Sequence, residues 1–267
     1  MNGHFRFKVA LQTMKDNLRI TIILTVLFMG IAVMYSGAYP AFKDIMKGLG
    51  PMMDEQFRFI PGAQDIGTFV GFLNMELYQI FWLLIMAIII GFIAASLISK
   101  ELESKTIDLL MSNPISRKQI IFEKYLGLIP TLLIINFATM FMVYGMAIAI
   151  NEEIKFENLF LAHVASIPYF LAVISIGLLI SVLIDEKMRA SIIMISILIG
   201  MFILRSISLM IPDYKSLGYI SLSHYFNPYD SLKYGKIDEV GIIVLLVVAI
   251  QILFISMIIF ERRDITV

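Results

Sequence analysis

The sequence predicts an all-α membrane protein with six transmembrane helices, preceded by a helix on the membrane surface. Apolar residues make up 59% of the 267 residues and charged residues 16%. A soluble domain typically has about 45–50% apolar and about 25% charged residues. The apolar residues also gather in stretches of about 18 or more positions without Asp, Glu, Lys or Arg, which is typical of membrane-spanning helices. This pattern excludes an ordinary soluble enzyme and a disordered chain.

The polar composition excludes several functional classes. The 21 basic and 21 acidic residues balance, which leaves no basic footprint for nucleic acid. Without cysteine there are no disulfides, thiolate nucleophiles or cysteine-bound metals. His4, His163 and His224 do not form a zinc-protease motif, and no phosphate-binding loop for ATP is present. We therefore expect no catalytic, cofactor-binding or metal site in this chain.

Six charge-poor stretches are long enough to cross a membrane, because about 20 helical residues span a hydrocarbon core of about 30 Å. They cover residues 20–39, 77–99, 125–150, 158–184, 190–211 and 240–260. The fifth is interrupted by Arg205. It could be a short span whose arginine reaches the membrane surface, or a helix that breaks and re-enters the membrane.

The basic residues predict the orientation of these spans. The termini and the loops after even-numbered spans hold the larger share of the 21 Lys and Arg residues. Basic flanks face the cytoplasm in most membrane proteins. We therefore expect a multi-pass protein of the cytoplasmic membrane, with both termini inside the cell and residues 1–267 forming one transmembrane domain.

The first segment, residues 3–17, has helical periodicity. Phe7, Leu11 and Met14 fall on one apolar stripe beside basic and polar positions. This arrangement favours an amphipathic helix at the cytoplasmic membrane surface over a plain basic tail.

Two outer loops have a mixed character. Proline and glycine divide the first loop, residues 40–76, into short pieces. The loop before the sixth span, residues 212–239, carries five tyrosines, which suit a membrane interface. We expect short half-helices in the outer leaflet there, with their backbone groups buried in protein or facing water.

The inner loop, residues 100–124, predicts a helix, a turn and a second helix. Asn113-Pro114 is a turn signal, and Ser116 can cap a helix that starts at Arg117. Ile107, Leu110 and Met111 would share one apolar face of the first helix. Either the membrane surface or a partner protein must cover that face.

Within the second span, small residues recur at every fourth position. They are Ala87, Gly91, Ala95 and Ser99. Such a stripe allows two helices to approach closely, either within one subunit or at a dimer seam. His163 falls near the outer end of the fourth span, where we expect a hydrogen-bonding role at the interface rather than a proton relay.

The stretch 66–124 carries two groups of residues, one on either side of the second span. Before the span it has Gly71-Phe72-Leu73-Asn74 with Glu76. After the span it has Glu101, Glu103, Thr106, Leu109, Leu110, Asn113-Pro114-Ile115-Ser116-Arg117 and Lys124. This stretch resembles the permease subunits of ABC-2 type ATP-binding-cassette transporters. The family's usual glycine before the threonine is Lys105 here. Phe226-Asn227-Pro228-Tyr229 also resembles a motif of the last outer loop in similar permeases.

The resemblance implies a non-catalytic permease subunit that forms the substrate pathway. Most members of the family belong to exporters, so we expect an exporter here. It places a coupling helix at 101–117, which would contact a separate P-loop ATPase. The contacting residues would be Glu101, Glu103, Thr106, Leu109, Leu110, Pro114, Ile115, Ser116 and Arg117. Leu109, Leu110 and Ile115 would enter an apolar groove on the ATPase. Glu101, Glu103 and Arg117, together with Lys118, would fix the register through ion pairs at the rim. Two ATPase copies would hold ATP and Mg²⁺, and a second permease copy would complete a homodimer.

Two other classes stay open on the residues alone. A secondary transporter or channel usually carries paired ionisable residues inside its spans, where this sequence offers mainly Arg205. A membrane-embedded enzyme would need a catalytic constellation, and His163 with Ser166 lacks a third member. The sequence does not indicate the transported substrate.

Overall fold

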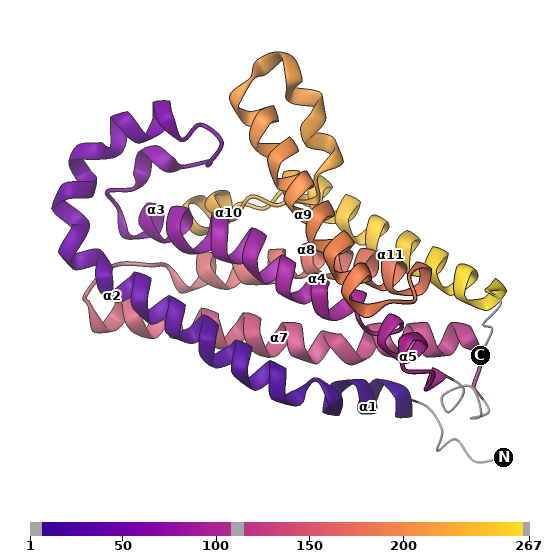
Figure 1. Cartoon of the computed structure of the whole chain (residues 1–267). Helices are drawn as coiled ribbons and strands as arrows, with labels where there is room; N and C mark the ends of the chain where they lie inside the picture. Colours follow the sequence, from indigo (N-terminus) through magenta and orange to yellow (C-terminus); the bar gives the residue numbers. More distant parts are fainter. Residues whose placement is uncertain (1–6, 108–114, 264–267) are drawn as a thin grey trace.

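The computed structural model describes residues 7–107 and 115–263, and these form helices joined by loops without any β-strand. In this described part, six helices are long and apolar enough to cross a membrane, as the sequence predicted (Figure 1). They cover Leu18–Leu49, Phe69–Glu103, Arg117–Ala149, Phe156–Leu183, Lys187–Met210 and Glu239–Arg262. The predicted all-α membrane fold is confirmed.

A short helix precedes the first span. Helix α1, Lys8–Asp16, is amphipathic and leads into the long α2, Leu18–Gln56. It lies against α7, Arg117–Ala149, so closely that a Cβ on Gly127 would stand 2.6 Å from the Thr13 Cβ. The buried Glu123 carboxylate accepts the N–H groups of Val9, at 2.8 Å, and Ala10, at 3.2 Å. An anion therefore satisfies two of the free donors at the start of α1.

The second span is longer than the sequence predicted and is built from several helical pieces. They are α3, Phe69–Leu73, a π-helical segment η2, Asn74–Met86, then α4, Ala87–Ala95, and α5, Ser99–Glu103. The Thr68 hydroxyl caps α3 by accepting the Gly71 N–H at 3.0 Å. A π-helix of this length is unusual, since most are single turns.

Helix α8, Phe156–Leu183, occupies the centre of the bundle, with α4, α7 and α11, Glu239–Arg262, around it. A Cβ on Gly177 of α8 would stand 2.7 Å from the Ala94 Cβ and 2.9 Å from the Gly91 carbonyl oxygen. On its other side, Gly91 faces Met194 of α9, Lys187–Met210. Ala87 and Ala95 are fully buried. The small-residue stripe therefore packs against helices of the same chain, which leaves no room there for a second copy.

Helix α9 continues unbroken past Arg205, and the chain then turns back beside it (Figure 1). The returning part is the 3₁₀ segment η3, Pro212–Ile220, followed by η4, Leu222–His224, and α10, Pro228–Tyr234. Arg205 is 4% exposed and faces the interior. Both sequence expectations for this span were therefore wrong: the arginine neither reaches the surface nor interrupts the helix.

Candidate functional site

The inner loop lies at one end of the bundle, together with α1 and the last turn of α11, whereas α3 and α10 lie at the opposite end (Figure 1). We call residues 99–107 and 115–124 the elbow. The segment 108–114 between its two halves, which includes Leu109, Leu110 and Pro114, lies outside the described residues.

A buried ion pair joins the two halves of the elbow. Lys124 donates to the Glu101 carboxylate at 2.5 Å, with residue exposures of 4% and 9%. Ile107, at the end of the first half, is also buried. Buried opposite charges at this distance attract strongly, and losing either one leaves the other without compensation. The pair therefore fixes the end of the second span to the start of the third.

The backbone within the first half of the elbow explains a departure from the family motif. Lys105 adopts a left-handed conformation with φ of 54°. The next residue, Thr106, donates its N–H to the Glu101 carbonyl at 2.9 Å and so closes the turn. Glycine adopts this conformation without steric cost, which accounts for the usual glycine at this place. Lys105 fits the turn, at the cost of a strained backbone.

Other elbow charges reach neighbouring helices. Glu103 accepts the backbone N–H of Lys187 at 2.9 Å, at the start of α9. Arg117 donates to the carbonyl of Arg263 at 2.5 Å, and Lys118 pairs with Glu261 of α11 at 2.7 Å.

Two further contacts complete this end of the bundle. Arg263, just after α11, contacts the Val182 carbonyl and Asp185 at the end of α8. The Ser116 hydroxyl accepts the Gln119 N–H at 3.2 Å and caps α7, as the sequence predicted. The elbow is thereby tied to α8, α9 and α11.

A polar network lies inside the bundle near the opposite end. The Gln79 amide of η2 donates to Asn74 at 3.3 Å and to Asn227 at 3.2 Å, and its oxygen accepts from Arg205 at 3.1 Å. Buried polar side chains need such partners. The network ties the second span to α9 and to the loop before α10.

His163 is fully buried rather than at an interface. Its Nδ1 lies 2.5 Å from the Asn136 amide oxygen, which can only accept, so Nδ1 carries the proton. Nε2 therefore accepts from the Tyr78 hydroxyl at 3.0 Å. Both ring nitrogens are satisfied, which is typical of a structural histidine.

The two outer motifs meet in space. A Cβ on Gly71 would stand 2.0 Å from the Asp65 carbonyl oxygen, so only glycine fits at the start of this motif. Asp65, in the short η1, Ala63–Asp65, contacts both Tyr229 and Lys233 of α10. Burial and the hydrogen bond to Asp65 raise the pKa of Tyr229. These contacts hold α10 against the entry of the second span.

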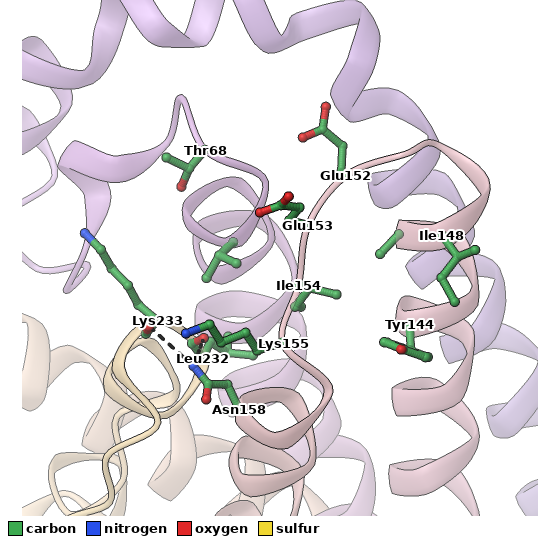
Figure 2. A pocket seen from close by; sticks show the side chains of 12 residues that line it. Thr68, Tyr144, Ile148, Glu152, Glu153, Ile154, Lys155, Asn158, Leu232 and Lys233 are labelled. Atoms are coloured by element: carbon green, nitrogen blue, oxygen red, sulfur yellow. Dashed lines mark hydrogen bonds between the residues drawn. The ribbon is translucent and has the colours of Figure 1, made fainter.

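Beside these motifs lies a cavity of about 530 Å³ (Figure 2). Its walls come from the start of α3, the end of α7, the loop between α7 and α8, the start of α8 and the end of α10. We call it the outer cavity.

Comparison with protein families identifies the chain. A model of the ABC-2 family transporter proteins matches residues 12–265. The chain belongs to this family. It is therefore a multi-pass membrane permease of the ABC-2 type, as the sequence resemblance indicated. A search of curated proteins finds no match.

In this ABC-2 permease the charged elbow residues that the sequence assigned to a partner have contacts within the chain. Glu101, Glu103, Arg117 and Lys118 all meet other helices of the bundle. Ile115 packs partly buried against the core, and Thr106 and Ser116 are exposed.

Sequence reasoning placed Asn74 and Lys124 in the family motif without assigning them these contacts, and it did not identify Glu123 or Gln79. Glu123 and Lys124 are charged residues in the first turns of an apolar helix, a pattern that indicates buried partners. Asn74 and Gln79 are amides within the second span and carried the same kind of signal. Their partners are distant in sequence, and no local pattern identifies them.

The arrangement at the elbow suits mechanical contact. The described residues contain no group of three His, Asp or Glu that could hold a metal. Glu101, Glu103, Arg117 and Lys118 of the elbow contact backbone groups or opposite charges of other segments at this end of the bundle. A force on the elbow would reach α7, α8, α9 and α11 together.

Proposed function

We propose that this permease is the membrane subunit of an ATP-binding-cassette exporter in the cytoplasmic membrane. In this proposal residues 1–267 form one transmembrane domain, two copies form the substrate pathway, and two separate P-loop ATPases bind ATP and Mg²⁺. The chain itself carries out no bond chemistry. Family membership and six apolar spans support this assignment.

The observation that carries the proposal is the set of contacts at the elbow. Glu101 with Lys124 joins the second span to the third, Glu103 caps α9, and Arg117 holds the end of α11. A displacement of this end by an ATPase would therefore move four spans rather than one loop. The larger share of basic residues at this end favours a cytoplasmic location, which places both termini inside the cell.

Within this proposal the elbow residues have two roles. Leu109, Leu110 and Pro114, with the exposed Thr106 and Ser116, contact the ATPase. Most of the affinity comes from the apolar pair, since exposed ion pairs contribute only about 0–1 kcal/mol each.

The remaining elbow residues transmit the movement of the ATPase to the spans. They contact the helix bundle rather than the ATPase, and they are Glu101, Glu103, Ile115 and Arg117.

The double variant Leu109→Asp with Leu110→Asp tests this proposal. It should abolish co-purification of the ATPase while the permease still inserts into the membrane, because two carboxylates would replace the apolar anchors. Ile220→Asp is the matched control, since Ile220 is exposed on η3, away from the elbow. Unchanged co-purification of the double variant would refute the proposed contact.

A further inference from the structure

The outer cavity carries two opposite charges that have no partner within the described chain. Glu153 and Lys155 stand two positions apart in the extended loop between α7 and α8. Among the residues that the structure describes, neither forms an ion pair or a side-chain hydrogen bond. Figure 2 shows both side chains on the same side of the loop, with Ile154 on the opposite side. A carboxylate and an ammonium group are thus available to one ligand.

The neighbouring charges of the outer cavity are already neutralised. Glu152 pairs with Lys43 of α2. Lys233 contacts Asp65 and the hydroxyl of Tyr229. Burial alone would lower the pKa of Lys233, but the hydrogen bonds to Asp65 and Tyr229 raise it, so the ammonium stays charged. These pairs brace the walls and leave Glu153 and Lys155 as the groups that can bind.

The position of these walls is fixed by hydrogen bonds between segments. Asn158, at the start of α8, donates to the carbonyl oxygen of Leu232 at 3.1 Å and to that of Lys233 at 3.4 Å (Figure 2). The left-handed Gly235, with φ of 62°, ends α10 beside this contact. The cavity is therefore preformed, as small-molecule sites usually are, and its volume lies within the range of about 300–1,000 Å³ for such sites.

One wall is apolar and continues into the membrane. This wall is the end of α7, where Tyr144 and Ile148 line the cavity and Ile148 is exposed. Further down α7, Phe141 and Ile134 are exposed as well, each seven positions from the last. Residues at that spacing lie on nearly the same face of a helix. An apolar stripe therefore leads from the cavity along the surface of α7 that faces the lipid.

We propose that the outer cavity binds a zwitterionic amphiphile, a molecule with a primary ammonium group, an anionic phosphate and an apolar chain. Glu153 accepts hydrogen bonds from the ammonium group, Lys155 donates to the phosphate, and the chain lies along Ile148, Phe141 and Ile134. The inference goes beyond the proposed function, because it holds whether or not this ligand is the transported one and does not depend on the ATPase.

The test measures lipid binding to the purified full-length permease in detergent by native mass spectrometry, with phosphatidylethanolamine and phosphatidylglycerol as probes. Lys155→Gln should weaken binding of both lipids about three- to tenfold, because both carry the phosphate. Glu153→Gln should weaken the binding of phosphatidylethanolamine by a similar factor. It should leave the binding of phosphatidylglycerol unchanged, because only phosphatidylethanolamine has an ammonium group. Lys155→Arg should retain both.

Two matched controls accompany these variants. Glu157→Gln and Lys215→Gln remove exposed charges that do not line the cavity, and they should bind both lipids like the unmodified chain. Equal binding by all variants, or equal losses in the controls, would overturn the proposal.

A second arm separates a lipid from a free zwitterion. Ile148→Ser should weaken the binding of phosphatidylethanolamine but leave the binding of the soluble phosphoethanolamine unchanged. If phosphoethanolamine bound as tightly as the lipid and Ile148→Ser changed neither, the apolar chain would have no place in the site. The amphiphile would then be excluded as the ligand.

Discussion

The two ends of the bundle treat their charges differently. At the elbow, residues from distant parts of the chain pair with one another, and Glu101 with Lys124 is buried. In the outer cavity, Glu153 and Lys155 stand close in sequence, yet neither pairs with another described residue. Paired charges between helices agree with the proposed mechanical role of the elbow, and unpaired charges in a braced cavity agree with the proposed binding role of the outer cavity.

Removing one member of the buried pair should have the largest effect. Lys124→Ala leaves the Glu101 carboxylate buried without its counter-charge, which should cost about 3–5 kcal/mol of stability. Lys118→Ala breaks the exposed pair with Glu261 and should cost about 0–1 kcal/mol. Thermal unfolding of both variants in the same detergent provides the measurement. Equal losses would break the comparison between buried and exposed charges at this end.

The anchoring of α1 should respond to its capping carboxylate. Glu123→Ala removes the acceptor for the Val9 and Ala10 N–H groups, which should cost about 0.5–2 kcal/mol. Hydrogen exchange should increase in α1 and stay constant in α10. Lys8 is also charged at this helix start, so Lys8→Ala is a useful companion variant. Unchanged exchange in α1 after Glu123→Ala would show that packing on α7 alone holds the helix.

The left-handed turn at the elbow predicts a gain in stability. Lys105→Gly should stabilise the protein by about 1 kcal/mol, because a non-glycine residue costs about 1–2 kcal/mol in this conformation. Lys100→Gly, inside α5, should instead destabilise it by about 1 kcal/mol. Opposite shifts of the unfolding midpoint would agree with the account, and a loss of stability in Lys105→Gly would contradict it.

The smallest effect on stability is expected from a change of pH, which acts on His224 at the outer end of the bundle. Burial lowers the pKa of His224, and Arg205 and Lys215 lower it further, although Asp238 opposes them. The unfolded chain therefore binds a proton more readily, and this contribution to stability is lost as pH falls below about 6.5. His224→Asn should reduce the difference in unfolding midpoint between pH 7.5 and 5.5. An unchanged difference would show that His224 does not contribute.

The six spans could be predicted because the membrane requires long apolar helices, and this requirement is local in the sequence. The helical start at Thr68 was missed, since the segment before residue 77 contains glycines that suggested a loop. Arg205 was misread because its partner, Gln79, belongs to a different span.

The candidate site followed the same rule. Ser116 could be identified as a cap from its neighbours alone, whereas the partners of Glu101, Glu103 and Arg117 depend on how the spans pack. The strained backbone of Lys105 left no sign in the sequence except the departure from glycine. Contacts between distant segments are thus where sequence reasoning stops.

The most direct test of the proposed function is to purify the tagged chain from native membranes in mild detergent and identify its companions by mass spectrometry. We expect a stoichiometric P-loop ATPase and ATP hydrolysis by the purified complex. Recovery of the permease alone in several detergents, without ATP hydrolysis, would contradict the central claim. A secondary transporter would then be the leading alternative, and Arg205 would be the first residue to change.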